Sequence, residues 1–331
     1  MKTAALLFGA LLAAGAQAQT LSFKDWSVAC DNTRHCEAVG YQREELELPV
    51  TLWLARDAGG NAPLRAMLDT MSEDDSGGPL SIRVGKLLIK DIKHREFTPE
   101  QVARLLPAMK EADSAQVSDG KHQWELSLAG LKAALLKMDD VQGRVGTVTA
   151  LIRPGGKPAS AVPTALPAPV LRAAVLPPPR AGDDKLLPEL LKAVRDEDCS
   201  TDAPSQAEGR NSQLARLSNS ELLLIAECTR GAYQASYGLW RVADRKPYKP
   251  VRLLLPNAEG KTDDMLVEPY FEKGVLQYYA KGRGINDCGS AGEWLWTADG
   301  FKLLSVSEGP QCRGFPGGGF MLRLWTAQQT K

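Results

Sequence analysis

The chain has 331 residues, with 40 lysines and arginines against 40 aspartates and glutamates, so its formal net charge is zero. Because the charges are balanced and interspersed, no overall field attracts nucleic acid or anionic lipid, and nucleic acid is not an expected partner. The chain is too long for one ordinary hydrophobic core, and its length predicts two domains.

The first 18 residues have the features of a secretory signal peptide. Lys2 gives a positive start, residues 4–14 form an apolar run too short to span a bilayer, and residues 16–18 read Ala-Gln-Ala, a typical cleavage site. We expect export to a Gram-negative periplasm and a mature chain that starts at Gln19; the alternative is an uncleaved anchor. No cysteine follows the cleavage site to carry a lipid, and no later window predicts a transmembrane helix.

Residues 19–152 predict an α+β domain with a mostly antiparallel sheet and two helices. One helix begins after Thr98, which is followed by Pro99 and by Gln101 in the capping-box position. The other starts at Ser127 or Gly130 and ends near Gly143. Periods of two predict strands at 23–31, 36–42, 50–57, 64–71, 81–90, 123–128 and 147–152.

Residues 153–182 are rich in proline and alanine and lack a useful period. Proline neither continues a helix nor donates to a central strand, so this segment predicts an extended, semi-rigid linker. Residues 183–331 then predict a mainly-β C-terminal domain, an antiparallel meander with one leading helix over 185–198. Asp299-Gly300 is the strongest hairpin signal in the chain. The strands are expected at 221–228, 237–242, 251–256, 274–282, 293–300, 301–309 and 319–327.

Six cysteines in an exported chain predict disulfides. They occur as three local pairs, and the linker separates one pair from the other two. Because disulfides rarely cross between domains that fold separately, the predicted bonds are Cys30–Cys36, Cys199–Cys228 and Cys288–Cys312. The alternative is metal binding, which is disfavoured because no Cys-x-x-Cys spacing exists and only His35 lies near a cysteine.

The stretch Gly-Arg-Gly-Ile-Asn-Asp-Cys-Gly, residues 282–289, has the residue types of a site. Arg283 would hold an anion and Asp287 would act as a general acid or base, with glycines admitting a ligand to the backbone. The alternative is a loop in which the glycines adopt positive φ and Cys288 is tied down. A phosphate loop is excluded, because Lys-Ser/Thr and a helix do not follow the glycines.

A second glycine-rich stretch, 314–320, follows Cys312. A Cys288–Cys312 bond would bring the two stretches side by side as an aromatic-rimmed binding surface, since interfaces favour exposed aromatic residues and arginine. The alternative is that the two tryptophans, which share one face of a strand, point into the core. The candidate binding residues are Arg283, Asp287, Trp294, Trp296, Arg313 and Phe315.

Other catalytic and metal-binding patterns do not occur in the sequence. The histidines are His35, His94 and His122, and they form no His-Glu-x-x-His. No Gly-x-Ser-x-Gly is present, and paired cysteines leave no thiolate nucleophile. The acidic run 71–78 lacks EF-hand spacing and is typical of a solvated loop. A Ser-His-Asp triad stays open as an alternative, because triads are recognised by geometry, and it could lie only in the N-terminal region, which contains all three histidines. The sequence otherwise predicts no catalytic residue, no metal and no cofactor.

Two passages carry a family resemblance. Residues 23–42, FKDWSVACDNTRHCEAVGYQ, and residues 279–314, YAKGRGINDCGSAGEWLWTADGFKLLSVSEGPQCRG, together resemble the bacterial family called domain of unknown function 1176. This resemblance covers nearly the whole mature chain. It implies an envelope protein with no assigned activity. Residues 21–152 also resemble, more weakly, the invasion-associated locus B proteins, which would imply a role at the cell envelope during host contact.

The sequence thus favours an exported, disulfide-stabilised protein that binds an envelope protein or a glycan without catalysis. An inhibitor of a cell-wall-degrading enzyme is one concrete version. The alternative is a periplasmic hydrolase that uses Asp287 or another carboxylate. Two carboxylates converging in a cleft would support that alternative.

Overall fold

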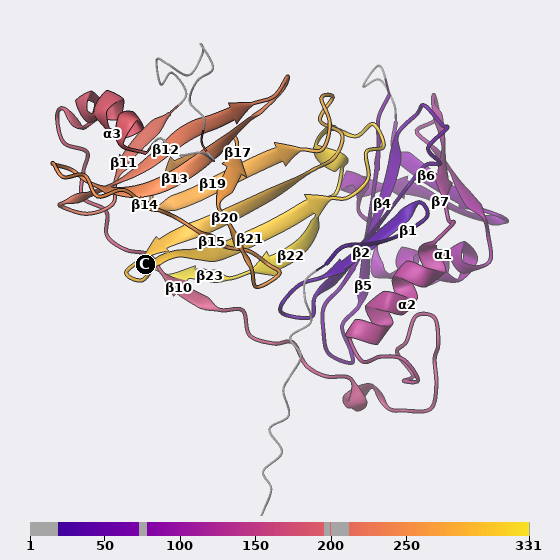
Figure 1. The fold of residues 1–331 in the computed structure, drawn as a ribbon. Coiled ribbons are helices and arrows are strands. Elements are labelled where there is room, and N and C mark those ends of the chain that lie inside the picture. The colour runs from indigo at the N-terminus through magenta and orange to yellow at the C-terminus, as the bar shows by residue number, and fades with distance from the viewer. Residues whose placement is uncertain (1–18, 73–77, 195–198, 200–211, 331) are drawn as a thin grey trace, which may run out of the picture.

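The computed structural model describes residues 19–72, 78–194, 199 and 212–330 (Figure 1). The expected signal peptide and residues 73–77 of the acidic run lie outside the described residues. Most of the described chain forms antiparallel sheets, as the sequence predicted. Within the described ranges, no helix is long and apolar enough to cross a membrane.

The N-terminal region, residues 19–152, contains two antiparallel sheets and two helices. The elements are β1 (Leu21–Phe23), β2 (Trp26–Cys30), β3 (Cys36–Tyr41), β4 (Val50–Arg56), β5 (Leu64–Thr70), β6 (Leu80–Val84), β7 (Leu87–Ile92), α1 (Pro99–Lys110), β8 (Ser114–Ser118), β9 (Gln123–Ser127) and α2 (Leu131–Val141). The first sheet is a meander in chain order from β1 to β5, and the second has the order β7-β6-β8-β9. Helix α1 packs on β5, β6 and β7, and helix α2 packs on β1, β2 and β3.

Local signals define where both helices begin. The Thr98 hydroxyl accepts a hydrogen bond from the Gln101 amide (3.2 Å), and the Gln101 side chain accepts one from the Thr98 amide (2.8 Å), which confirms the capping box. Gly130 precedes α2 with a φ of 102°, and a Cβ there would lie 1.7 Å from the Phe23 carbonyl oxygen. Conformation and space therefore both require glycine at this position.

The strand expected at 147–152 is wrong, because this segment is a series of turns. The Asp139 carboxylate, near the end of α2, accepts hydrogen bonds from the amides of Leu151 (2.7 Å) and of the residue that follows it (3.0 Å). Arg56 donates to the Thr149 carbonyl oxygen (2.8 Å). Buried charged side chains thus satisfy the backbone groups that a neighbouring strand would otherwise satisfy.

The C-terminal region, residues 183–330, is mainly β with one leading helix, as predicted. The strands are β11 (Gln213–Arg216), β12 (Glu221–Arg230), β13 (Ala235–Ala243), β14 (Val251–Arg252), β15 (Leu255–Pro256), β16 (Thr262–Asp263), β17 (Met265–Val267), β18 (Tyr270–Glu272), β19 (Val275–Lys281), β20 (Gly289–Thr297), β21 (Gly300–Gly309) and β22 (Leu322–Thr326). One five-stranded sheet has the order β11-β12-β13-β14 with β17 also paired to β13, the other is the meander β18 to β22, and β15 pairs with β16. The Asp299-Gly300 turn joins β20 to β21, which confirms the predicted hairpin. A parallel pair joins β10 (Val170–Arg172) to β23 (Gln328–Thr330).

The leading helix is shorter than predicted. It is α3 (Leu187–Ala193), preceded by a 3-10 turn over Asp183–Leu186, and residues 195–198 lie outside the described residues. The Asp183 carboxylate accepts two hydrogen bonds from the buried Arg216 guanidinium (2.9 and 2.5 Å). This ion pair holds the turn against β11.

One hydrophobic core fills the N-terminal region, two lie in the C-terminal region, and a small junction core lies between the regions. One face of β2 and β3 packs into the N-terminal core, and the other face packs against β22. Both strands are therefore largely buried on two faces, rather than half-buried as the sequence pattern of the first strand suggested. Figure 1 shows β2 beside β22 at this junction. The junction core contains Ala29, Val39, Tyr41, Leu322 and Leu324.

Candidate functional site

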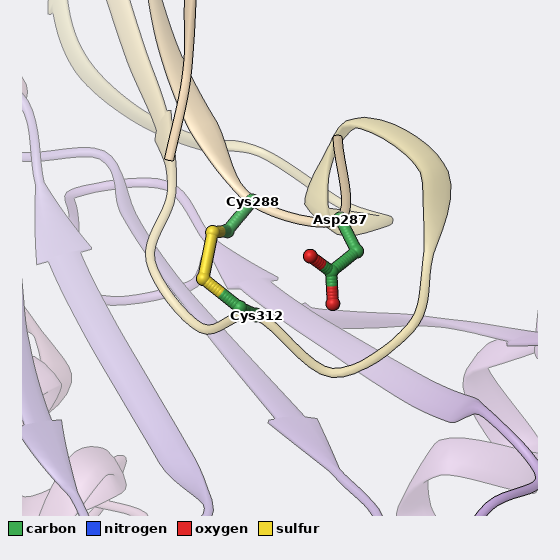
Figure 2. Close-up of side chains that lie close together, drawn as sticks. All are labelled: Asp287, Cys288 and Cys312. Atoms are coloured by element: carbon green, nitrogen blue, oxygen red, sulfur yellow. A yellow bond between two sulfur atoms is a disulfide. The ribbon is translucent and has the colours of Figure 1, made fainter. Parts of the chain in front are cut away.

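The two glycine-rich stretches are joined by a disulfide between Cys288 and Cys312 (Figure 2). The Gly282 amide closes the first loop by donating to the Cys288 carbonyl oxygen at 2.8 Å. A Cβ at Gly282 would lie 2.4 Å from the Cys288 sulfur, so only glycine lets the backbone approach the bond this closely. The other two bonds, Cys30–Cys36 and Cys199–Cys228, join the pairs that the spacing predicted.

Asp287 and Arg283 pair with each other inside this loop. Arg283 donates from Nε to Asp287 Oδ1 (2.7 Å) and from Nη2 to Oδ2 (2.5 Å). The Gly314 amide donates to the same Oδ2 at 2.7 Å, and the Asp287 side chain is only 2% exposed. The hydrogen bonds from Arg283 hold the pKa of Asp287 below its usual value in spite of burial. Asp287 is thus an ionised, saturated structural carboxylate, which is poorly suited to general acid or base chemistry.

Asp287 also lies close to both sulfurs of the disulfide. Its carboxylate and the Cys288 and Cys312 sulfurs fall within 4.8 Å of one another (Figure 2). Cysteine binds metals as a thiolate, and these sulfurs are bonded to each other. These three side chains therefore form a disulfide cross-link beside a carboxylate, and they do not supply the ligands of a metal centre.

Arg313 is held by the N-terminal region. Its Nη2 pairs with Asp25 Oδ1 at 3.0 Å, and its Nη1 donates to the Gln42 carbonyl oxygen at 3.2 Å. The Gln42 side chain donates in return to the Arg313 carbonyl oxygen at 2.7 Å. The guanidinium is only 11% exposed. Arg313 therefore connects the two regions of the chain.

Further side-chain hydrogen bonds cross the same junction. Gln311 donates to the Ser27 hydroxyl (2.9 Å), and the Tyr41 hydroxyl donates to the Gly318 carbonyl oxygen (3.1 Å). Asn32 exchanges two hydrogen bonds with the backbone of Thr326. The passages 23–42 and 279–314, which are far apart in sequence, thus contact each other directly. No local sequence signal indicates this contact.

All three aromatic residues among the predicted binding residues lie in the interior. Trp294 is 1% exposed, donates from its indole nitrogen to the Pro256 carbonyl oxygen (2.6 Å), and packs on Tyr278. Phe315 is 3% exposed. Trp296 is also buried, on the same strand as Trp294. These rings occupy the core, as the alternative interpretation expected for the tryptophans, and they do not rim a surface.

Two exposed apolar side chains beside Arg283 were missed by the sequence reasoning. Tyr233 is 74% exposed in the β12–β13 turn, and Ile285 is 71% exposed in the 282–288 loop. Together with Arg283 and Gly284 they line a hollow of about 340 Å³. The only sequence signal for Tyr233 is an aromatic residue in a short turn between two strands.

Gln234 holds the two exposed loops in place. Its side-chain nitrogen donates to the Tyr279 carbonyl oxygen (3.1 Å), and its side-chain oxygen accepts from the Lys281 amide (2.9 Å). The turn that carries Tyr233 is thereby fixed to β19, from which the Arg283 loop emerges.

Arg283 also lines a second, polar hollow of about 290 Å³. This polar hollow is lined by Gln42, Glu44, Leu46, Glu47, Arg283, Cys312, Arg313 and Gly314.

Comparison with known proteins places the chain in a family. Residues 20–328 match the model described as "Protein of unknown function (DUF1176)". The chain is 30% identical over 328 residues to "Uncharacterized protein YpfG" of Escherichia coli (strain K12), covering 92% of each. The crystal structure of invasion associated protein b from Bartonella henselae matches 38% of this chain and 99% of that chain, at 16% identity and a TM-score of 0.29, too weak a likeness to inform the fold. The chain belongs to the DUF1176 family.

Proposed function

We propose that this chain is an exported periplasmic protein, cut after Ala18, that binds an envelope protein without catalysing a reaction. The three disulfides support export, because such bonds persist in oxidising compartments. We further propose that residues 19–152 and 183–331 are two domains joined by 153–182. Hydrophobic cores contained within each region support this division.

The proposed binding surface consists of Tyr233, Arg283 and Ile285, and is called the tip surface below. The observation that carries the proposal is that two large, exposed apolar side chains flank a half-exposed arginine on two adjacent loops. Aromatic residues and arginine dominate the binding energy of protein interfaces. The Cys288–Cys312 bond and Gln234 hold both loops, so binding orders little additional chain.

The polar hollow next to the tip surface suggests the chemistry of the partner. It is lined by Glu44 and Glu47. The two arginines in the same lining already have acidic partners, because Arg283 pairs with Asp287 and Arg313 pairs with Asp25. A partner that places an apolar side chain on the tip surface and a lysine or arginine beside it would be complementary in shape and in charge. The hydrolase alternative gains no support from Asp287, whose carboxylate is buried and fully engaged.

Site-specific photo-crosslinking in the periplasm tests this proposal. A photoreactive phenylalanine at position 285 is expected to capture a discrete protein, whereas the same group at Tyr270, an exposed residue on β18, is expected not to. Adding Tyr233→Ala should reduce the crosslink at least about tenfold without changing stability, because Tyr233 is exposed. Equal capture at both positions, or capture unaffected by Tyr233→Ala, would contradict the proposal. If no protein crosslink forms and this chain instead sediments with cell-wall glycan, the partner is a glycan and not a protein.

A further inference from the structure

His35 lies in the loop before β3 and is only 5% exposed. Its Nδ1 lies 2.5 Å from Asp57 Oδ1, and its Nε2 lies 3.1 Å from Glu37 Oε1. Ionised carboxylates only accept hydrogen bonds, and a neutral imidazole has a single N–H to donate. Both contacts are therefore satisfied together only when His35 is protonated and positively charged.

The same cluster extends across the junction to β22. Glu37 Oε2 accepts a hydrogen bond from the Arg323 amide at 2.6 Å, and the Arg323 side chain lies 2.6 Å from Asp31 Oδ2. The Asp31 side chain is fully buried, and its other oxygen accepts from the Thr33 and His35 amides. Glu37 thus contacts His35 through one oxygen and the backbone of β22 through the other.

The charges of this cluster balance only when His35 carries a proton. The groups that face it come from the 31–36 loop, from β3, from the ends of β4 and β5, and from β22. Three carboxylates then face three cations, and loss of the imidazole proton leaves an uncompensated negative charge beside the buried side chains of Asp31, His35 and Glu37. The other three members are partly exposed to solvent. The anions are Asp31, Glu37 and Asp57, and the cations are His35, Arg65 and Arg323.

We propose that His35 is a proton-operated latch on the contact between β3 and β22. With the proton bound, His35 holds Glu37 in the position from which it accepts the Arg323 amide. The neutral ring keeps one N–H, which stays in the shorter contact, with Asp57 (2.5 Å against 3.1 Å to Glu37). The bare Nε2 then faces the Glu37 carboxylate, and this repulsion releases Glu37 from its place against β22. This proposal is independent of the tip surface and of any partner.

The direction of the pH dependence follows from the surroundings of the ring. Burial by itself lowers the pKa of His35, but the hydrogen bonds to Glu37 and Asp57 outweigh it, and the net shift is upward from 6.5. A group whose folded-state pKa is raised stabilises the fold fully below its unfolded-state pKa, and that contribution is lost as the pH rises through the folded-state pKa. The latch is therefore closed in mild acid and opens towards alkaline pH.

Hydrogen exchange of β22 amides, corrected for the intrinsic pH dependence of exchange, tests the latch. From about pH 5.5 to about pH 8.5, the protection of residues 322–326 should fall by roughly three- to tenfold, while β4 stays protected. His35→Gln, which cannot change charge, should remove this pH dependence, and His94→Gln, at an exposed histidine, should retain it. An NMR titration of the wild-type His35 ring gives its pKa without any substitution. Flat protection of β22 in the wild type, or an unchanged pH dependence in His35→Gln, would overturn the proposal.

Discussion

Replacing Cys288 and Cys312 with alanine is expected to lower the free energy of unfolding of the C-terminal region by about 3–4 kcal/mol. The bond spans 24 residues, so its loss returns the conformational entropy of a loop of that length to the unfolded chain. It also releases the backbone that presents Asp287 and Arg313. Urea-dependent hydrogen exchange of β20 and β21 measures the change.

The Cys199–Cys228 bond provides a matched control for this experiment. It spans 29 residues, so its removal costs a similar amount through loop entropy, but it lies in the other sheet of the C-terminal region. Only the Cys288→Ala/Cys312→Ala variant should also lose exchange protection at residues 23–31, across the junction. If both variants lowered exchange protection at residues 23–31 equally, the Cys288–Cys312 bond would have no specific role at the junction.

Asp287→Ala is expected to reduce stability by about 2–3 kcal/mol at neutral pH, because hydrogen bonds to a buried charged group are lost and the Gly314 amide is left without its acceptor. The pKa of Asp287 lies below its usual value, so its contribution is present above the unfolded-state pKa and is lost as the pH falls through the folded-state pKa. The stability difference between wild type and variant should therefore shrink in acid. Urea unfolding across the acid range measures it.

Glu221→Ala is the matched control for Asp287→Ala. Glu221 also pairs with an arginine of the C-terminal region, Arg241, at 3.3 Å, but both side chains are about 40% exposed. Exposed ion pairs contribute little to stability, so this loss should be much smaller. If Asp287→Ala lowered the free energy of unfolding no more than Glu221→Ala does, the stability of the loop would not depend on its buried carboxylate. That result would favour a catalytic or binding role for Asp287.

Features encoded by neighbouring residues could be predicted from the sequence. The Thr98 capping box and the Asp299-Gly300 hairpin depend on a few consecutive residues, and the structure contains both. The cysteine pairing followed from the nearness of each partner to the other in the chain and from the linker that separates one pair from the other two. The alternation of Trp294 and Trp296 correctly indicated a shared face, but alternation does not say which face is buried.

Features that depend on contacts between distant parts of the chain could not be predicted from the sequence. The strand expected at 147–152 failed because Asp139 and Arg56, which are distant in sequence, take its backbone hydrogen bonds. The Asp25–Arg313 pair joins residues separated by 288 positions, and it forms only where β2 and β3 meet β22. For the same reason, the glycine-rich motif 282–289 has the residue types of an active site, and only the folded structure shows that its arginine and aspartate pair with each other.

The passages 23–42 and 279–314 contact each other and hold the two regions together. A double-mutant cycle of Asp25→Ala and Arg313→Ala tests this contact most directly, since the two side chains are 3.0 Å apart and largely buried. We expect a coupling of about 1–2 kcal/mol in the free energy of unfolding. Additive single effects, with a coupling below about 0.3 kcal/mol, would contradict this expectation.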